Sequence, residues 1–261
     1  MKAVRILVKA ANALLSAAAV LFLITAGSYS AYALWDNAQV YSTADNVMSE
    51  LLSLKPKPGA PEDNGASFEE LLAVNGDVCA WLTLDGTRID YPILQGEDNL
   101  SYINTDVYGS FALAGSIFLD SRCDNTFHDA YALVYGHHMD NGRMFGDLDK
   151  YKDGKFFGEN SAGALILPDR SYKLEIFACM LVPAAEGMIF DTQMRQTDIG
   201  GLLDFAEAEA VHLRPDTVET ARGAESPQII ALSTCSSEYT DARTIVLAYM
   251  TPYTTETQVG G

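Results

Sequence analysis

The stretch that decides the fold runs from residue 231 to residue 243 and reads Ala-Leu-Ser-Thr-Cys-Ser-Ser-Glu-Tyr-Thr-Asp-Ala-Arg. Apolar residues 229–232 lead into Cys235, and a second apolar run, residues 245–250, follows Arg243. This pattern predicts a strand that ends at the cysteine, a short loop, and a strand that begins at the arginine. A thiol becomes a good nucleophile as a thiolate, which a nearby cation favours. An arginine can also donate hydrogen bonds to an oxyanion that develops during acyl transfer.

A cysteine nucleophile also needs a group that gives and takes a proton. The chain has four histidines, His128, His137, His138 and His212. The segment Tyr131-Ala-Leu-Val-Tyr-Gly-His-His-Met139 again reads as a short apolar strand that ends in a glycine and then in titratable side chains. The ends of two strands can meet in space although they lie about a hundred residues apart. We therefore take His137 as the candidate acid/base and keep His138 as the alternative.

The residues 135–139 (Tyr-Gly-His-His-Met), the residues 232–235 (Leu-Ser-Thr-Cys) and Arg243 together resemble the sortases, the membrane-anchored cysteine transpeptidases of Gram-positive bacteria, and most closely class B. The resemblance covers roughly residues 67 to 251. Two positions depart from the family pattern: Ala231 replaces a Thr, and His138 replaces an Asn. Further stretches that agree are residues 86–93, 114–120 and 142–151.

The resemblance implies a mostly β fold, an eight-stranded sortase-type β-barrel with peripheral helices. It also implies that Cys235 attacks the carbonyl after Thr in a sorting motif near the C-terminus of an exported protein, that Arg243 stabilises the oxyanion, and that His137 protonates the leaving amine. An amine of a peptidoglycan precursor then resolves the thioacyl enzyme. We expect Ser233, Thr234, Asp241 and His138 to contribute to substrate binding, and Asp241 is also a candidate to orient Arg243 or His137.

Three other functions stay open at this point. A pilin-polymerising sortase would use a lysine as the acceptor. A hydrolytic cysteine peptidase would use the same nucleophile and base with water. An exported structural or adhesin-like β-domain would hold Cys235 as an inert buried thiol.

The N-terminal part predicts a membrane anchor. Residues 10–35 carry no formal charge and are strongly apolar, and about 20 such residues span a bilayer as a helix. Basic residues precede this stretch, so residues 1–9 are expected in the cytoplasm and the rest of the chain outside. A cleaved signal peptide is the alternative, because Ala31-Tyr-Ala33 fits a cleavage site.

The remaining chain divides into a juxtamembrane helix and linker (36–66), a catalytic domain (67–251) and a tail (252–261). Apolar residues at helical spacing predict an amphipathic helix over residues 40–52, and the proline-rich residues 55–65 predict a linker. Another helix is expected over about residues 198–212. The expected strands are residues 78–84, 89–94, 116–119, 132–135, 164–167, 172–182, 229–233 and 245–250.

Composition excludes several partners. The chain has 17 basic and 35 acidic side chains, a net charge of −18, which argues against nucleic-acid binding. The acidic residues lack an EF-hand pattern and the four cysteines lack a zinc spacing, so we predict no metal and no cofactor. An even number of cysteines in an exported protein permits disulfides, and sequence alone does not pair Cys79, Cys123 or Cys179.

Overall fold

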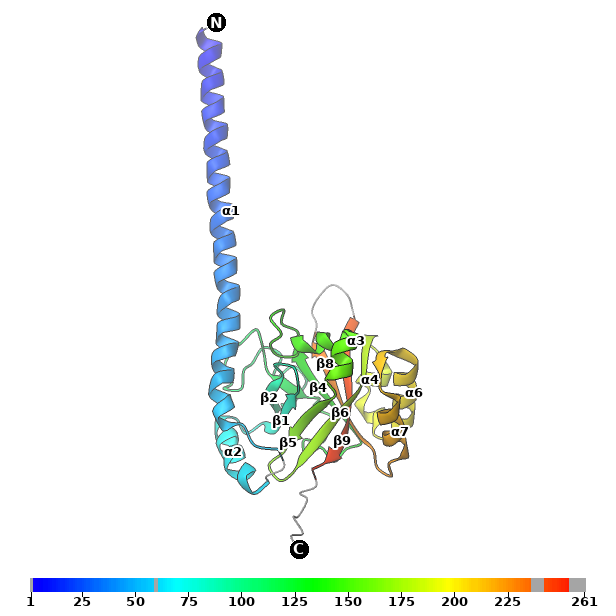
Figure 1. The fold of residues 1–261 in the computed structure, drawn as a ribbon. Coiled ribbons are helices and arrows are strands. Elements are labelled where there is room, and N and C mark those ends of the chain that lie inside the picture. Colours follow the sequence, from blue (N-terminus) through cyan, green and yellow to red (C-terminus); the bar gives the residue numbers. More distant parts are fainter. Residues whose placement is uncertain (1, 59–60, 236–241, 254–261) are drawn as a thin grey trace. The chain divides into compact units, whose positions relative to one another are not determined.

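The computed structural model describes the backbone of residues 2–58, 61–235 and 242–253 (Figure 1). The side chains at 37, 41, 43–46, 61–66 and 235 lie outside the described part, so Cys235 is placed by its backbone alone, and Asp241 is not described at all. The chain forms two compact units, Met1–Asp45 and Asn46–Gly261.

The first unit is helical. Helix α1 spans Lys2–Leu51, and its Lys2–Val40 part is long and apolar enough to cross a membrane, with a mean hydropathy of 2.1 in its most apolar window. None of that window is buried, and side chains such as Leu14 and Phe22 are exposed. The predicted N-terminal apolar helix is therefore present as a candidate membrane span, continuous with the helix expected over residues 40–52.

The second unit is a closed β-barrel (Figure 1). Its hydrogen-bonded order is β5-β1-β2-β3-β4-β8-β9-β6, and a further pairing of β5 with β6 closes the ring, so eight strands form the barrel. The pairs β2–β3 and β4–β8 are parallel and the others antiparallel. The strands are β1 (Val78–Leu84), β2 (Asp90–Leu94), β3 (Ile117–Leu119), β4 (Tyr131–His137), β5 (Ala162–Ile166), β6 (Ser171–Pro183), β7 (Ala210–Leu213), β8 (Gln228–Cys235) and β9 (Ala242–Pro252).

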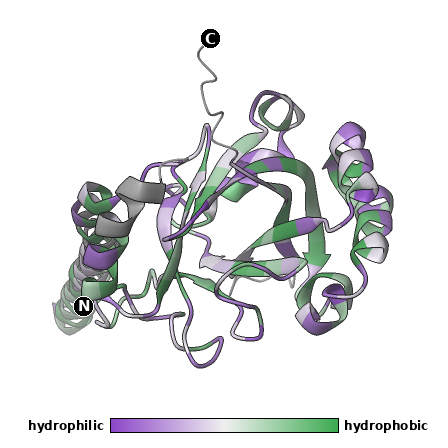
Figure 2. Cartoon of the chain, turned by 90° about the horizontal axis from the view of Figure 1, so that it is seen from below, coloured by the Kyte–Doolittle hydropathy of each residue, from purple (hydrophilic) through white to green (hydrophobic). Residues whose placement is uncertain are grey.

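Helices cover the outside of this ring. Helices α6 and α7 contact β6, and α5 contacts β4. Residues 229–232 of β8 are all fully buried. Strand β8 is therefore covered on both faces, which explains why its sequence is a continuous apolar run. Figure 2 shows the barrel strands largely in the hydrophobic colour. The helical elements of this unit are η1 (Leu52–Leu54), α2 (Pro61–Val74), η2 (Gly146–Lys152), α3 (Gly154–Glu159), α4 (Gly187–Phe190), α5 (Thr192–Arg195), α6 (Ile199–Glu209) and α7 (Pro215–Gly223).

All eight predicted strands are present, and three local features differ from the predictions. The linker expected to reach residue 65 ends earlier, because α2 begins at Pro61, a residue that suits the first position of a helix. The helix expected over residues 198–212 ends at Glu209, where β7 takes over. Strand β7 was not predicted; it extends the sheet beyond the barrel by pairing with β6.

Gly136 is required by packing on the core side of β4. A Cβ built there would lie 2.4 Å from Cδ1 of Ile117 and 2.8 Å from Cγ of Phe145. Both neighbours are buried, so they have little room to move. The glycine before the histidines is thus explained by the barrel interior.

We predict that Gly136→Ala lowers the free energy of unfolding by about 1–3 kcal/mol, the usual cost of overpacking a core. Urea denaturation of the domain measures this. Gly158→Ala is the control, because Gly158 lies in α3, a Cβ there would meet no atom within 4 Å beyond its own helix backbone and chain neighbours, and alanine is the better helix former. Equal stabilities of the two variants would show that the contact at Gly136 costs nothing.

Candidate active site

The strand register brings the three candidate catalytic positions into one row. In the parallel pair β4–β8, His137 lies opposite Cys235. In the antiparallel pair β8–β9, the last paired residues are Ser233 and Ile245, and Arg243 lies two residues beyond this pair at the start of β9. Neighbouring strands lie about 4.8 Å apart. The backbone of Cys235 therefore lies beside that of His137, and Arg243 stands at the start of the strand on the other side of β8.

The ring of His137 is held by a backbone carbonyl. Its Nε2 lies 2.6 Å from the carbonyl oxygen of Ile103, in the segment between β2 and β3. Because a carbonyl oxygen only accepts, Nε2 carries a hydrogen in this arrangement. The nitrogen that can take up or release a proton is then Nδ1.

His138 belongs to a different environment. Successive residues of a strand point to opposite faces, so its ring leaves the face of His137. Its Nε2 lies 3.1 Å from Oδ2 of Asp149, and its Nδ1 lies 3.9 Å from Asp140. The two histidines of the sequence motif are thus separated by the sheet, and only His137 shares a face with the position of Cys235.

Arg243 is half-buried at the start of β9. Its Nη1 donates to the carbonyl oxygen of Thr234 at 3.3 Å, the residue before Cys235. The guanidinium is therefore held beside the end of β8. The predicted role of Asp241 in orienting it falls on a residue outside the described part of the chain.

A hollow of about 190 Å³ opens beside this row. Two stacked aromatic rings form one wall of it: the ring centroids of Tyr135 and Phe190 lie 6.4 Å apart, and the ring planes are nearly parallel, at 6°. Ser233 and Thr234, both predicted to bind substrate, line it together with Arg243, although their side chains are buried. The full lining is Arg122, Tyr135, Ala184, Phe190, Ser233, Thr234 and Arg243.

An ion pair between the buried Asp120 and the exposed Arg122, which was not predicted from the sequence, supports one wall of the hollow. Asp120 is fully buried and accepts from Arg122 at 2.9 Å and 2.7 Å, and from the hydroxyl of Tyr135 at 3.2 Å. Burial alone would raise the pKa of Asp120, but the hydrogen bonds from Arg122 outweigh it, so the pKa lies below its usual value. Arg122 also donates to the carbonyl of Phe190 at 2.9 Å. A carboxylate directly after an apolar strand was the sequence signal for this pair.

The other three cysteines are poor nucleophiles. Cys79, Cys123 and Cys179 are free thiols. Burial raises the pKa of each to about 12, so they are protonated at neutral pH. Only a thiolate attacks efficiently. Chemistry by a thiol therefore points to Cys235.

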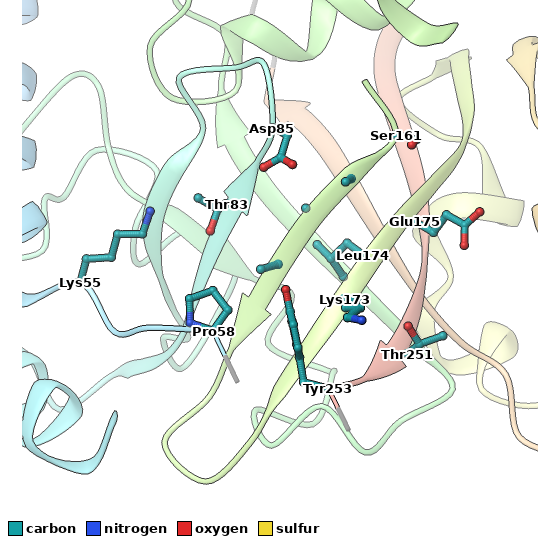
Figure 3. A pocket seen from close by; sticks show the side chains of 13 residues that line it. Lys55, Pro58, Thr83, Asp85, Ser161, Lys173, Leu174, Glu175, Thr251 and Tyr253 are labelled. Carbon is teal, nitrogen blue, oxygen red and sulfur yellow. The ribbon is translucent and has the colours of Figure 1, made fainter. Parts of the chain in front are cut away.

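A larger hollow, of about 470 Å³, lies on another part of the barrel wall (Figure 3). Lys55 and Pro58 lie along one side of it and Lys173 and Glu175 along the other. The described residues that line it include neither a cysteine nor a histidine. Within the described part of the chain there is also no group of three His, Cys, Asp or Glu side chains that could hold a metal ion.

Comparison with known proteins identifies the family. No protein-family model matches the chain. The chain is 34% identical to sortase B of Listeria monocytogenes over 172 residues, which cover 66% of this chain and 68% of the relative.

Two solved structures share the fold. A class B sortase of Streptococcus pyogenes that is involved in pilus biogenesis is 38% identical, with a TM-score of 0.63 over 72% of this chain and 99% of the other. A mutant form of sortase B from Clostridium perfringens is 28% identical, with a TM-score of 0.68 over 78% and 96%.

Sequence identity over two thirds of a relative, together with an eight-stranded barrel matched by class B sortase structures, settles the family. The chain belongs to the class B sortases, a family of cysteine transpeptidases.

Proposed function

We propose that Cys235 is the nucleophile, His137 the general acid and base, and Arg243 the oxyanion donor of a transpeptidation on exported proteins. The observation that carries this proposal is the row of three positions across β4, β8 and β9. Cysteine, imidazole and guanidinium on adjacent strand ends provide the three functions that acyl transfer through a thioester needs.

The reaction proceeds in two steps. The Cys235 thiolate attacks the carbonyl carbon after Thr in the sorting motif, and Arg243 donates to the oxygen that becomes negative. The C–N bond breaks as His137 gives a proton to the leaving amine, which leaves a thioester on Cys235. An incoming amine attacks this thioester, loses a proton to His137, and releases the thiolate.

The acceptor is an amine of a peptidoglycan precursor in this proposal. A lysine of a pilin subunit is the second candidate, and the relative involved in pilus biogenesis favours it. Hydrolysis by water uses the same three residues. The three acceptors therefore give different products but need the same three proposed catalytic residues.

The chain is proposed to work at the outer face of a cell membrane. Residues 10–35, within the candidate span of α1, would cross the bilayer. Lys2, Arg5 and Lys9 precede them, and basic residues favour the cytoplasmic side. Residues 36–66 then connect to a catalytic domain of residues 67–251 on the outside, with residues 252–261 as a tail.

The first test combines thiol labelling with product analysis. At pH 8 iodoacetamide should modify Cys235 in the folded domain and spare the other three thiols, because a thiol of pKa about 12 is only about one part in 10⁴ ionised there. A peptide from the C-terminus of an exported protein encoded beside this one should leave a thioacyl adduct on Cys235.

Cys235→Ala is the control, and it should fold, form no adduct and give no turnover. Mass spectrometry of the products with and without added amine separates transfer from hydrolysis. An adduct on Cys79, Cys123 or Cys179 would contradict the assignment.

The second test separates the two histidines. His137→Ala should lower kcat/KM by about 10²–10⁴, the usual contribution of a general acid/base. His138→Ala should lose much less, because its ring contacts Asp149 on the other face. Steady-state kinetics of both variants decide, and a larger loss at His138 would reverse the assignment.

The third test asks whether Arg243 acts through its planar fork of donors. Arg243→Lys keeps the charge but not the fork, so kcat should fall by about 10²–10³, the effect of losing one oxyanion donor. Arg222→Lys is the matched control, since Arg222 makes exposed ion pairs with Asp204 and Glu207, where lysine serves nearly as well. A wild-type rate for Arg243→Lys would remove it from the catalytic set.

A further inference from the structure

Each of the three proposed catalytic positions has a polar neighbour in sequence on the opposite face of the sheet. His138 follows His137, Thr234 precedes Cys235, and Thr244 follows Arg243. Because side chains alternate along a strand, these three neighbours share the back of the row. Thr234 lies in β8, Thr244 lies in β9, and His138 is the residue that follows β4.

One carboxylate, that of Asp149 in η2, contacts two of these neighbours directly. Its Oδ1 accepts from the hydroxyl of Thr244 at 2.8 Å, and its Oδ2 lies 3.1 Å from Nε2 of His138. The third neighbour is connected through Thr244, whose backbone amide donates to the hydroxyl of Thr234 at 3.3 Å. Asp149 thus joins the ends of all three strands from behind.

These bonds lie where the regular ladder between β8 and β9 runs out. The last paired residues of that ladder are Ser233 and Ile245. Beyond this pair, side chains make the contacts: Thr244 binds Thr234 and Asp149, and Arg243 binds the carbonyl of Thr234. Thr234 and Thr244 are only 3% and 5% exposed, so water competes little for their hydrogen bonds.

The charge of Asp149 is stabilised in place. Burial alone would raise the pKa of Asp149, but hydrogen bonds from Lys152 and Thr244 outweigh it and hold the pKa below its usual value. Lys152 Nζ lies 2.7 Å from Oδ1. The carboxylate is therefore ionised at neutral pH, and an ionised acceptor makes the stronger hydrogen bonds to Thr244 and His138.

We propose that Asp149 is a positioning residue that holds His137, Cys235 and Arg243 in register by fixing the opposite face of their strand ends. The inference rests on the proposed function, since it concerns the geometry of the same three residues. Asp149 acts on β9 and β8 through Thr244, and on the end of β4 through His138. It does not touch the substrate.

A positioning role differs from a purely structural one in what it changes. The Asp149 side chain is 36% exposed, and a partly exposed ion pair contributes little to folding. Small shifts of catalytic groups, in contrast, cost up to about 10² in rate. Loss of Asp149 should therefore lower kcat strongly while KM and the melting temperature change little.

The experiment compares Asp149→Asn, Thr244→Val and the double variant, with the peptide that the wild type cleaves as substrate. We expect each single variant to lower kcat by about 10- to 100-fold. The double variant should be no worse than the poorer single one, because both changes break the same connection. Thr244→Ser, which keeps the hydroxyl, should restore most of the rate.

Asp153→Asn is the matched control. Asp153 caps α3 by accepting from the amide of Phe156, and asparagine caps as well as aspartate. Its kcat should match that of the wild type. The Asp153→Asn variant loses one negative charge in the same region as Asp149→Asn does. It therefore tests whether the loss of charge alone lowers kcat.

Iodoacetamide provides a readout that needs no peptide. Removal of a negative charge behind the three strand ends should by itself favour the thiolate and speed its alkylation. Displacement of the Arg243 guanidinium from the end of β8 should disfavour the thiolate and slow its alkylation. We expect slower alkylation of Cys235 in Asp149→Asn at pH 7.

Three results would overturn the proposal. One is a kcat for Asp149→Asn within twofold of the wild type. Another is a double variant whose fold-loss in kcat equals the product of the fold-losses of the two single variants, because the two changes would then act independently. The third is a fall in rate matched by an equal loss of folded protein. The thioacyl adduct distinguishes the two levels: if the wild type forms it and Asp149→Asn forms it equally fast, only the positioning role fails, and if the wild type forms none at Cys235, both proposals fail.

Discussion

The parallel pairing of β4 with β8 is the constraint on which the rest of the site depends. Strand β4 ends at His137 and β8 ends at Cys235, and their register sets these two residues side by side. A slip by one residue would place His138 opposite Cys235 in place of His137 and would reverse the faces of the two rings. The register is fixed well away from the site, by the fully buried residues Tyr131, Leu133 and Ile230 in the body of the two strands. The core of the barrel thus determines which histidine lies opposite the backbone of Cys235.

Much of this fold could be predicted because apolar runs mark buried strands. All eight barrel strands were recognisable, since each is covered on at least one face. Strand β7 was not, because residues 210–213 are only half-buried and continue the apolar spacing of α6. The start of α2 at Pro61 was hidden by a proline-rich composition typical of linkers. In each case a tertiary contact or a local cap decided what composition left ambiguous.

The candidate site could be predicted in part for the same reason. Cys235, His137 and Arg243 stand at the ends of recognisable strands, so the sequence pointed to them. The sequence could not choose between adjacent histidines, because only the register shows that one ring contacts Ile103 and the other Asp149. Arg122 was missed because its role comes from a buried partner, Asp120, and from the distant carbonyl of Phe190. Such contacts join segments that no periodicity connects.

The proposed catalytic row by itself does not select the acceptor. Attack by an amine of a cell-wall precursor, by a pilin lysine or by water needs the same thioester and the same proton transfers. A relative involved in pilus biogenesis has the same fold as sortase B from another species, each at a TM-score above 0.6 to this chain. The difference between acceptors must therefore arise from the surfaces beside the row. One such surface is the wall formed by Tyr135 and Phe190, which Arg122 joins to the buried Asp120. In the proposed mechanism the strand ends supply the reacting groups, and the segments between the strands shape what reaches them.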